Sequence, residues 1–82
     1  MTGAGAFSVA GQRVTVVGAA RSGLAAAELL ARRGAIVTLS ESKPALEAAD
    51  LDRLAGAGVA TELGRHDPST FTDAALVVSS PG

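Results

Sequence analysis

The segment 17–24, Val-Gly-Ala-Ala-Arg-Ser-Gly-Leu, contains residue types that can bind a phosphate group. It joins a β-branched run to a helix-like pattern, which indicates a strand, a tight turn and a helix start. Gly18 permits the sharp turn, and Gly23 lets the helix lie close to the strand. Backbone N–H groups and the positive end of the helix dipole then face one point, where Arg21 and Ser22 add further donors. We therefore predict a phosphate site at this turn, with a turn that binds nothing as the alternative.

Ala20 departs from the usual pattern of a dinucleotide-binding turn. A glycine at that place lets the backbone touch the pyrophosphate. The methyl group of alanine does not forbid a phosphate, but it pushes the ligand outward. The departure lowers the expectation of a nicotinamide dinucleotide at this turn.

A second polar segment, Ser40-Glu41-Ser42-Lys43, ends the next predicted strand. In a nucleotide-binding topology, this position overhangs the first turn, where a ribose or base extends from the phosphates. Glu41 can accept hydrogen bonds from hydroxyl or ring N–H groups, Ser42 can donate one and Lys43 supplies a charge. The alternative is that Ser42 caps a helix and the charged groups lie in solvent.

A third polar segment, Ser79-Ser80-Pro81-Gly82, follows the last predicted strand. A ligand across the switch point of the sheet would run along this loop. Its polar groups and backbone, including Ser80 and Gly82, would then meet the phosphates or the base. A simple strand exit is the alternative.

The only histidine, His66, precedes Asp67 and Pro68, a pair typical of a helix start. No cysteine is present and no second ligand stands at metal spacing, so we expect no metal site. No nucleophile is placed beside His66, so we expect no catalytic residue there. We expect His66 to shape the turn before Asp67.

Length and composition limit the classes of protein. The 82 residues make one small domain or a piece of a larger protein, and the 48% hydrophobic content excludes a disordered tail. A net charge of −1 and 2% aromatic residues argue against nucleic-acid binding. No apolar stretch is long enough for a membrane helix and no signal peptide is apparent, so we expect a cytoplasmic protein with no membrane partner.

The pattern along the chain alternates between strands and helices. We expect strands at 13–17, 35–39, 59–63 and 75–79, and helices at 22–33, 44–57 and 67–71. Such alternation predicts an α/β fold, a Rossmann-like half with a four-stranded parallel sheet in the order 3-2-1-4 and helices on both faces. We expect one domain over 1–82 with a flexible lead at 1–6, and a fourth strand whose open edge allows self-association.

Four segments together carry a family resemblance: 14–27, 34–44, 63–68 and 78–82. They closely resemble the amino-terminal domain of the UDP-N-acetylmuramoyl-L-alanine:D-glutamate ligases, the MurD family of Mur ligases. The resemblance implies a Rossmann-like domain that holds UDP, with the diphosphate facing Arg21, Ser22 and the turn around Ala20 and Gly23. It implies that residues 41–43 surround the uridine and that residues 80–82 lie near the same nucleotide.

Two positions differ from that family. Relatives commonly carry glycine at Ala20 and aspartate at Glu41, so this chain has less room at the phosphates and a longer reach toward the uridine. Neither difference looks disabling.

The resemblance also implies the reaction of the complete ligase. ATP phosphorylates the carboxylate of UDP-N-acetylmuramoyl-L-alanine, and D-glutamate attacks the acyl phosphate with Mg²⁺ assisting, in peptidoglycan precursor synthesis. No Gly-Lys-Ser or Gly-Lys-Thr loop occurs in these residues, so we expect this piece to bind without catalysing and the ATP-binding central and carboxyl-terminal domains to lie elsewhere.

Two rival functions stay open. In the NAD(P)-binding half-domain of an oxidoreductase, Glu41 would hold the adenosine ribose, or Ser42 and Lys43 a 2′-phosphate. The other rival is a sensor domain that binds a nucleotide without turnover.

Overall fold

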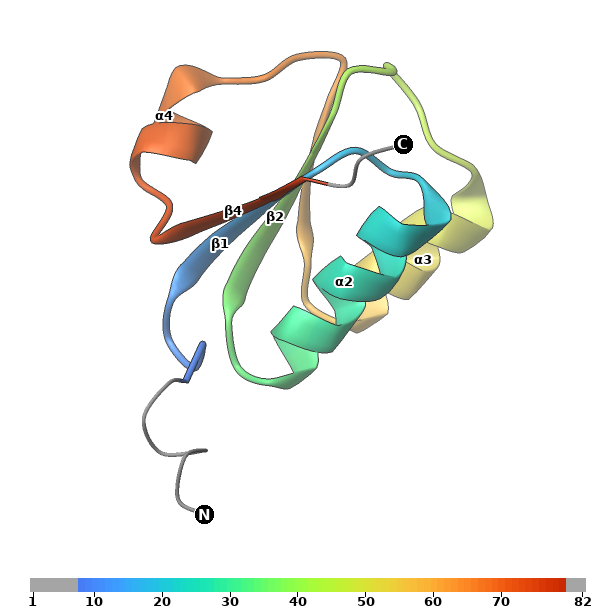
Figure 1. Ribbon diagram of the computed structural model, residues 1–82. Helices are drawn as coiled ribbons and strands as arrows, with labels where there is room; N and C mark the ends of the chain where they lie inside the picture. Colours follow the sequence, from blue (N-terminus) through green and yellow to red (C-terminus); the bar gives the residue numbers. More distant parts are fainter. Residues whose placement is uncertain (1–7, 80–82) are drawn as a thin grey trace.

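The strands of the computed structural model, which describes residues 8–79, form one parallel sheet with helices on both faces (Figure 1). The strands are β1 Arg13–Val17, β2 Ile36–Glu41, β3 Ala60–Leu63 and β4 Leu76–Ser79, and the helices are α2 Arg21–Arg32, α3 Ala48–Gly56 and α4 Pro68–Thr72. The sheet has the order β3-β2-β1-β4. The predicted fold class and strand order are therefore confirmed.

One face of the sheet carries the hydrophobic core. The parallel register of β1 and β2 pairs Val14 with Val37 and Val16 with Leu39, so these four side chains point to the same side of the sheet. Helices α2 and α3 cover them, chiefly through Leu24, Ala27 and Leu54, and each of these seven side chains is at most 6% exposed. This packing fixes α2 over β1 and β2, and so fixes the turn that joins β1 to α2.

The short helix α4 lies on the opposite face of the sheet (Figure 1). Thr15 is buried on this face, and its hydroxyl donates to the carbonyl of Thr70 in α4 over 2.6 Å. Because strand order reverses between β3 and β4, a right-handed crossover carries α4 to the side away from α2 and α3.

The segment between β2 and α3 differs from the prediction. Strand β2 continues to Glu41, and α3 begins at Ala48 with Glu47 as its N-cap, so Pro44 does not start the helix. The alternative in which Ser42 caps this helix is therefore wrong. The chain bends at residues 42–44 instead, where the Gly64 N–H donates to the carbonyls of Glu41, over 2.8 Å, and Lys43, over 2.9 Å.

Some of the predictions fall on residues that the structure does not describe. The flexible lead at 1–6, and the site residues Ser80 and Gly82, lie outside residues 8–79. Within the described part of the chain, no helix has the length and apolar character needed to cross a membrane.

Candidate functional site

The turn between β1 and α2 depends on its two glycines. Gly18 has a φ of +94°, which L side chains rarely adopt, and its N–H donates to the Ser40 carbonyl over 2.9 Å. At Gly23, a Cβ atom would collide with the carbonyl of Gly18. The backbone roles predicted for both glycines are therefore confirmed.

The start of α2 offers backbone donors. Its N-cap is Ala20, which has no side chain that accepts a hydrogen bond, and its first turn contains no acidic residue. The first α-helical bond runs from the Leu24 N–H to the Ala20 carbonyl, so the amides of Arg21 and Gly23 precede the helical ladder. The exposed guanidinium of Arg21 forms no ion pair within residues 8–79. Helix dipole and side chain thus give this end of α2 positive character.

An open groove of about 700 Å³ lies between the starts of α2 and α3. Its lining consists of residues from the turn and both helices: Ala19, Ala20, Arg21, Leu24, Glu47, Ala49, Asp50 and Arg53. Two of the predicted site residues, Ala20 and Arg21, form part of this lining, while Ser42 and Lys43 do not. The groove lies beside the turn that follows the carboxyl end of β1, and ligands bind at this end of the strands in open α/β sheets.

The carboxylate of Glu41 joins β2 to the β1–α2 turn. Its Oε1 accepts the N–H of Ala19 over 2.7 Å, and its Oε2 accepts the N–H of Lys43 over 2.8 Å and the Ser42 hydroxyl over 3.3 Å. Glu41 is 8% exposed. The backbone N–H of Lys43, then that of Ala19, hold the pKa of Glu41 below its ordinary value against the opposing effect of burial, so Glu41 is ionised at neutral pH.

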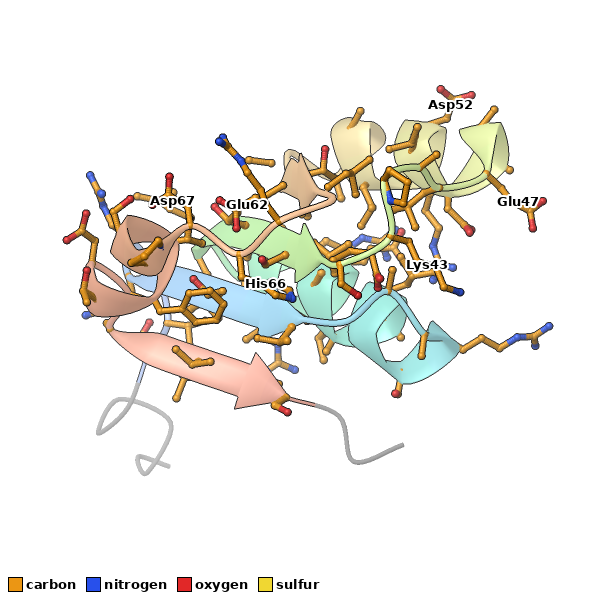
Figure 2. All side chains as sticks on the ribbon, turned by 90° about the horizontal axis from the view of Figure 1, so that it is seen from above. Lys43, Glu47, Asp52, Glu62, His66 and Asp67 are labelled. Carbon is orange, nitrogen blue, oxygen red and sulfur yellow. The ribbon has the colours of Figure 1, made fainter. Side chains whose placement is uncertain are left out.

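Ser42 and Lys43, the two residues that follow Glu41, are exposed. In Figure 2, Lys43 lies beyond the carboxyl ends of β1 and β2, toward the start of α2. The structure therefore brings residues 18–23 and 41–43 to the same end of the sheet.

The α3 side of the groove, which includes Asp50 and Arg53, was not among the site residues predicted from the sequence. Arg53 donates from Nε and Nη2 to Glu28 Oε1, over 2.9 and 2.7 Å, and thereby ties α3 to α2. The hydrogen bond from Arg53 holds the pKa of Glu28 below its ordinary value. Arg53 and Glu28 are 25 positions apart. The only feature of the sequence that could have indicated their contact is that consecutive crossover helices pack side by side.

A second polar cluster lies on the face covered by α4 (Figure 2). Glu62 accepts the hydroxyls of Ser40, over 2.7 Å, and Thr70, over 2.8 Å, and the Asp67 N–H over 3.0 Å. These bonds, the one from Ser40 first, hold the pKa of Glu62 below its ordinary value. His66 Nδ1 lies 2.6 Å from the Ser40 hydroxyl. The expectation that no serine lies beside this histidine is therefore wrong, because β2 brings in a serine from 26 positions away.

A smaller hollow of about 220 Å³ lies beneath α4. Its lining includes Arg13, Ile36 and Asp73. Arg13 and Ile36 begin their strands, so this hollow is at the end of the sheet opposite to the one where α/β folds bind ligands. The groove at the start of α2 is the better candidate.

Comparison with known proteins identifies close relatives. A model of the "Mur ligase MurD-like, N-terminal domain" matches residues 12–82. The UDP-N-acetylmuramoylalanine–D-glutamate ligase of Anaeromyxobacter dehalogenans is 54% identical over 74 residues, which are 88% of this chain and 16% of that ligase. The corresponding ligase of Geotalea daltonii is 47% identical over 77 residues, covering 93% of this chain and 17% of that ligase. The chain thus spans about a sixth of the length of these relatives.

Solved structures share the fold. The precorrin-2 dehydrogenase SirC superimposes with a TM-score of 0.73 over 93% of this chain and 37% of its own, at 16% identity. At that identity the likeness concerns the fold alone.

Proposed function

This chain belongs to the family of MurD-like Mur ligase N-terminal domains, and from this premise we propose that it binds the UDP part of UDP-N-acetylmuramoyl-L-alanine. The named relatives are ligases for this substrate and D-glutamate. The chain covers 17% of such a ligase, and we propose that substrate binding is the part of the ligase function that it supplies. We place that protein in the cytoplasm, in peptidoglycan precursor synthesis.

The observation that carries the proposal is the start of α2. An uncapped helix N-terminus beside a glycine turn opens into a groove, and Arg21 lines that groove. A diphosphate carries the negative charge that such a helix end stabilises. Arg21, Ser22 and the backbone around Gly18, Ala20 and Gly23 would hold the diphosphate.

The nucleoside would extend from the diphosphate toward the end of β2. Ser42 and Lys43 are exposed there and have donors for the uridine. Ser80 and Gly82 complete the proposed set from the segment after β4. Glu41 belongs to the same set, although its carboxylate already accepts three hydrogen bonds.

The residues of this chain do not fit ATP and Mg²⁺. The sequence has no Gly-Lys-Ser or Gly-Lys-Thr loop, and residues 8–79 hold no group of three His, Cys, Asp or Glu side chains that could bind a metal ion. We therefore assign ATP, Mg²⁺ and the attack by D-glutamate to the remainder of the ligase, and substrate binding without catalysis to this chain.

An NAD(P)-binding function is the rival proposal, and two features speak against it. Ala20 crowds the place where a dinucleotide pyrophosphate approaches the backbone. In NAD-binding folds an acidic residue at the end of β2 holds the ribose hydroxyls, whereas Glu41 is turned to the amides of Ala19 and Lys43.

Titration calorimetry of the chain with UDP, UDP-N-acetylmuramate, NAD and NADP tests the proposal. We expect binding of both UDP compounds and no binding of either dinucleotide. Arg21→Ala should weaken UDP binding by about tenfold, the worth of one charge-assisted hydrogen bond. Arg33→Ala, an exposed change beyond the far end of α2, should leave it unchanged. Binding of NADP without any binding of UDP at millimolar concentration would overturn the proposal.

A further inference from the structure

Two backbone N–H groups of the β1–α2 turn already donate hydrogen bonds to residues of β2. The Gly18 N–H donates to the Ser40 carbonyl over 2.9 Å, and the Ala19 N–H donates to Glu41 Oε1 over 2.7 Å. The bond from the Ala19 N–H to Glu41 is short and charge-assisted, so this N–H group is not available to a second anion. A phosphate oxygen reaches the Ala19 N–H only if the Glu41 carboxylate leaves it.

Glu41 is itself held from the other side. Its Oε2 accepts the Lys43 N–H over 2.8 Å and the Ser42 hydroxyl over 3.3 Å, and the residue is 8% exposed. The carboxylate is therefore a fixed bridge between the exit of β2 and the turn. Its bond to the Ala19 N–H ties the turn to the exit of β2.

The charge on this bridge also acts on a phosphate. Glu41 places a negative charge beside Ala19, and two like charges repel more strongly as their separation falls. The start of α2, with the amides of Arg21 and Gly23 and the Arg21 guanidinium, has the opposite polarity. Both charges thus favour a diphosphate at the helix start, two residues along the chain from the bridged amide.

We propose that Glu41 is a positioning residue that sets where the diphosphate binds: it occupies the Ala19 amide and so directs the phosphates to Arg21 and Gly23. The inference rests on the proposed function, because it requires a diphosphate at this turn. It gives Glu41 a role toward the phosphates rather than toward the nucleoside.

The test compares three ligands that separate the two parts of UDP. UDP, pyrophosphate and uridine are titrated into the wild-type chain, Glu41→Gln, Glu41→Ala and the control Asp52→Asn, with backbone amide signals recorded by NMR. Glu41→Gln keeps an oxygen for the Ala19 N–H but loses the charge, whereas Glu41→Ala frees the amide. Asp52→Asn removes one exposed negative charge from α3, and Asp52 does not line the groove.

In the wild-type chain, UDP and pyrophosphate should shift the amide signals of Arg21 and Gly23 and leave that of Ala19 in place. In Glu41→Ala the Ala19 signal should join those that respond. The affinities for UDP and pyrophosphate should rise together by about tenfold, the worth of the one charge-assisted hydrogen bond gained from the Ala19 N–H, and should rise less in Glu41→Gln. Uridine binding should not change, and Asp52→Asn should behave as wild type.

Three results would overturn the proposal. The first is a folded Glu41→Ala chain with wild-type affinities and an unresponsive Ala19 amide. The second is a loss of uridine affinity with pyrophosphate affinity kept, which would place Glu41 on the nucleoside. The third applies if Glu41→Ala does not fold. It is a Glu41→Gln chain whose Ala19 amide exchanges hydrogen at the wild-type rate and whose pyrophosphate affinity equals that of the wild type.

The proposed function and the inference fail in different ways. A wild-type chain that binds neither UDP nor pyrophosphate refutes the proposed function, and the inference with it. A wild-type chain that binds UDP while the Glu41 variants bind it equally well refutes the inference alone.

Discussion

Ser40 and Glu62 face each other across β2 and β3, and Ser40 Oγ lies 2.7 Å from Glu62 Oε1. The same hydroxyl lies 2.6 Å from His66 Nδ1. A serine hydroxyl has one proton, and an ionised Glu62 has none to give. Ser40 therefore donates to Glu62, and His66 donates its Nδ1–H to Ser40.

This chain of donors predicts the tautomer of His66. Neutral His66 should carry its proton on Nδ1, leaving Nε2 as the acceptor, and long-range ¹H–¹⁵N correlation of the ring shows which nitrogen is protonated. Ser40→Ala removes the acceptor for Nδ1–H, so the Nε2–H form should then appear. Observation of the Nε2–H form in the wild-type chain would contradict these hydrogen-bond directions.

Gly23 provides a test of the packing of α2 on β1. Gly23→Ala places a Cβ against the Gly18 carbonyl, and such overpacking should lower the free energy of unfolding by about 1–3 kcal/mol or more. Gly56→Ala is the matched control, since a Cβ there meets nothing within 4 Å, and it should raise the free energy of unfolding by about 0.4–1 kcal/mol. Urea denaturation measures both. Equal effects of the two substitutions would show that the turn does not lie against α2 as described.

The Glu41 bridge predicts a pH dependence of stability. Hydrogen bonds from Lys43 and Ala19 lower the pKa of Glu41 from its ordinary value of 4.5. The unfolded chain then binds more protons, so the contribution of Glu41 is complete above pH 4.5 and is lost as pH falls through the lower folded-state pKa.

Comparison with Glu41→Gln isolates this contribution, because Glu28, Glu62 and Asp67 also have lowered pKa values and act in the same direction. The difference in unfolding free energy between wild type and variant should be constant near neutral pH and shrink below pH 4.5. Urea denaturation at a series of pH values measures it. A difference that stays constant down to about pH 2, below the range in which a paired carboxylate titrates, would contradict the bridge.

Strand β4 predicts self-association of the chain. It is an edge of the sheet, and Leu76 and Val77 are 41% and 44% exposed on it. Open apolar edges pair with other chains, so sedimentation should show association that increases with concentration, and Val77→Lys should reduce it. A strictly monomeric wild-type chain at high concentration would count against this prediction.

The strand order and the glycine turn could be predicted because both depend on local pattern. The β-branched runs at 13–17 and 36–39 are buried strands, and their alternation with helices leads to one topology. Gly18 and Gly23 have backbone roles that follow from their positions relative to the strand and the helix.

The bridge from Glu41 to Ala19 could not be predicted in the same way. It joins residues 22 positions apart and depends on where β2 ends relative to β1, which the short apolar run does not reveal. The start of α3 was misplaced for a similar reason. Pro44 is typical of a helix start, but Gly64, a distant residue, packs against Pro44 and bonds to the carbonyl of Lys43. Because the start of α3 was misplaced, the residues of α3 that line the groove were not predicted.

The decisive experiment is a crystal structure of the chain with UDP. We expect the diphosphate in the groove at the start of α2, with phosphate oxygens within hydrogen-bond distance of the Arg21 and Gly23 amides, and the uridine toward residues 41–43. UDP bound in the hollow beneath α4, or a diphosphate pointing away from α2, would show that the helix start is not the phosphate site.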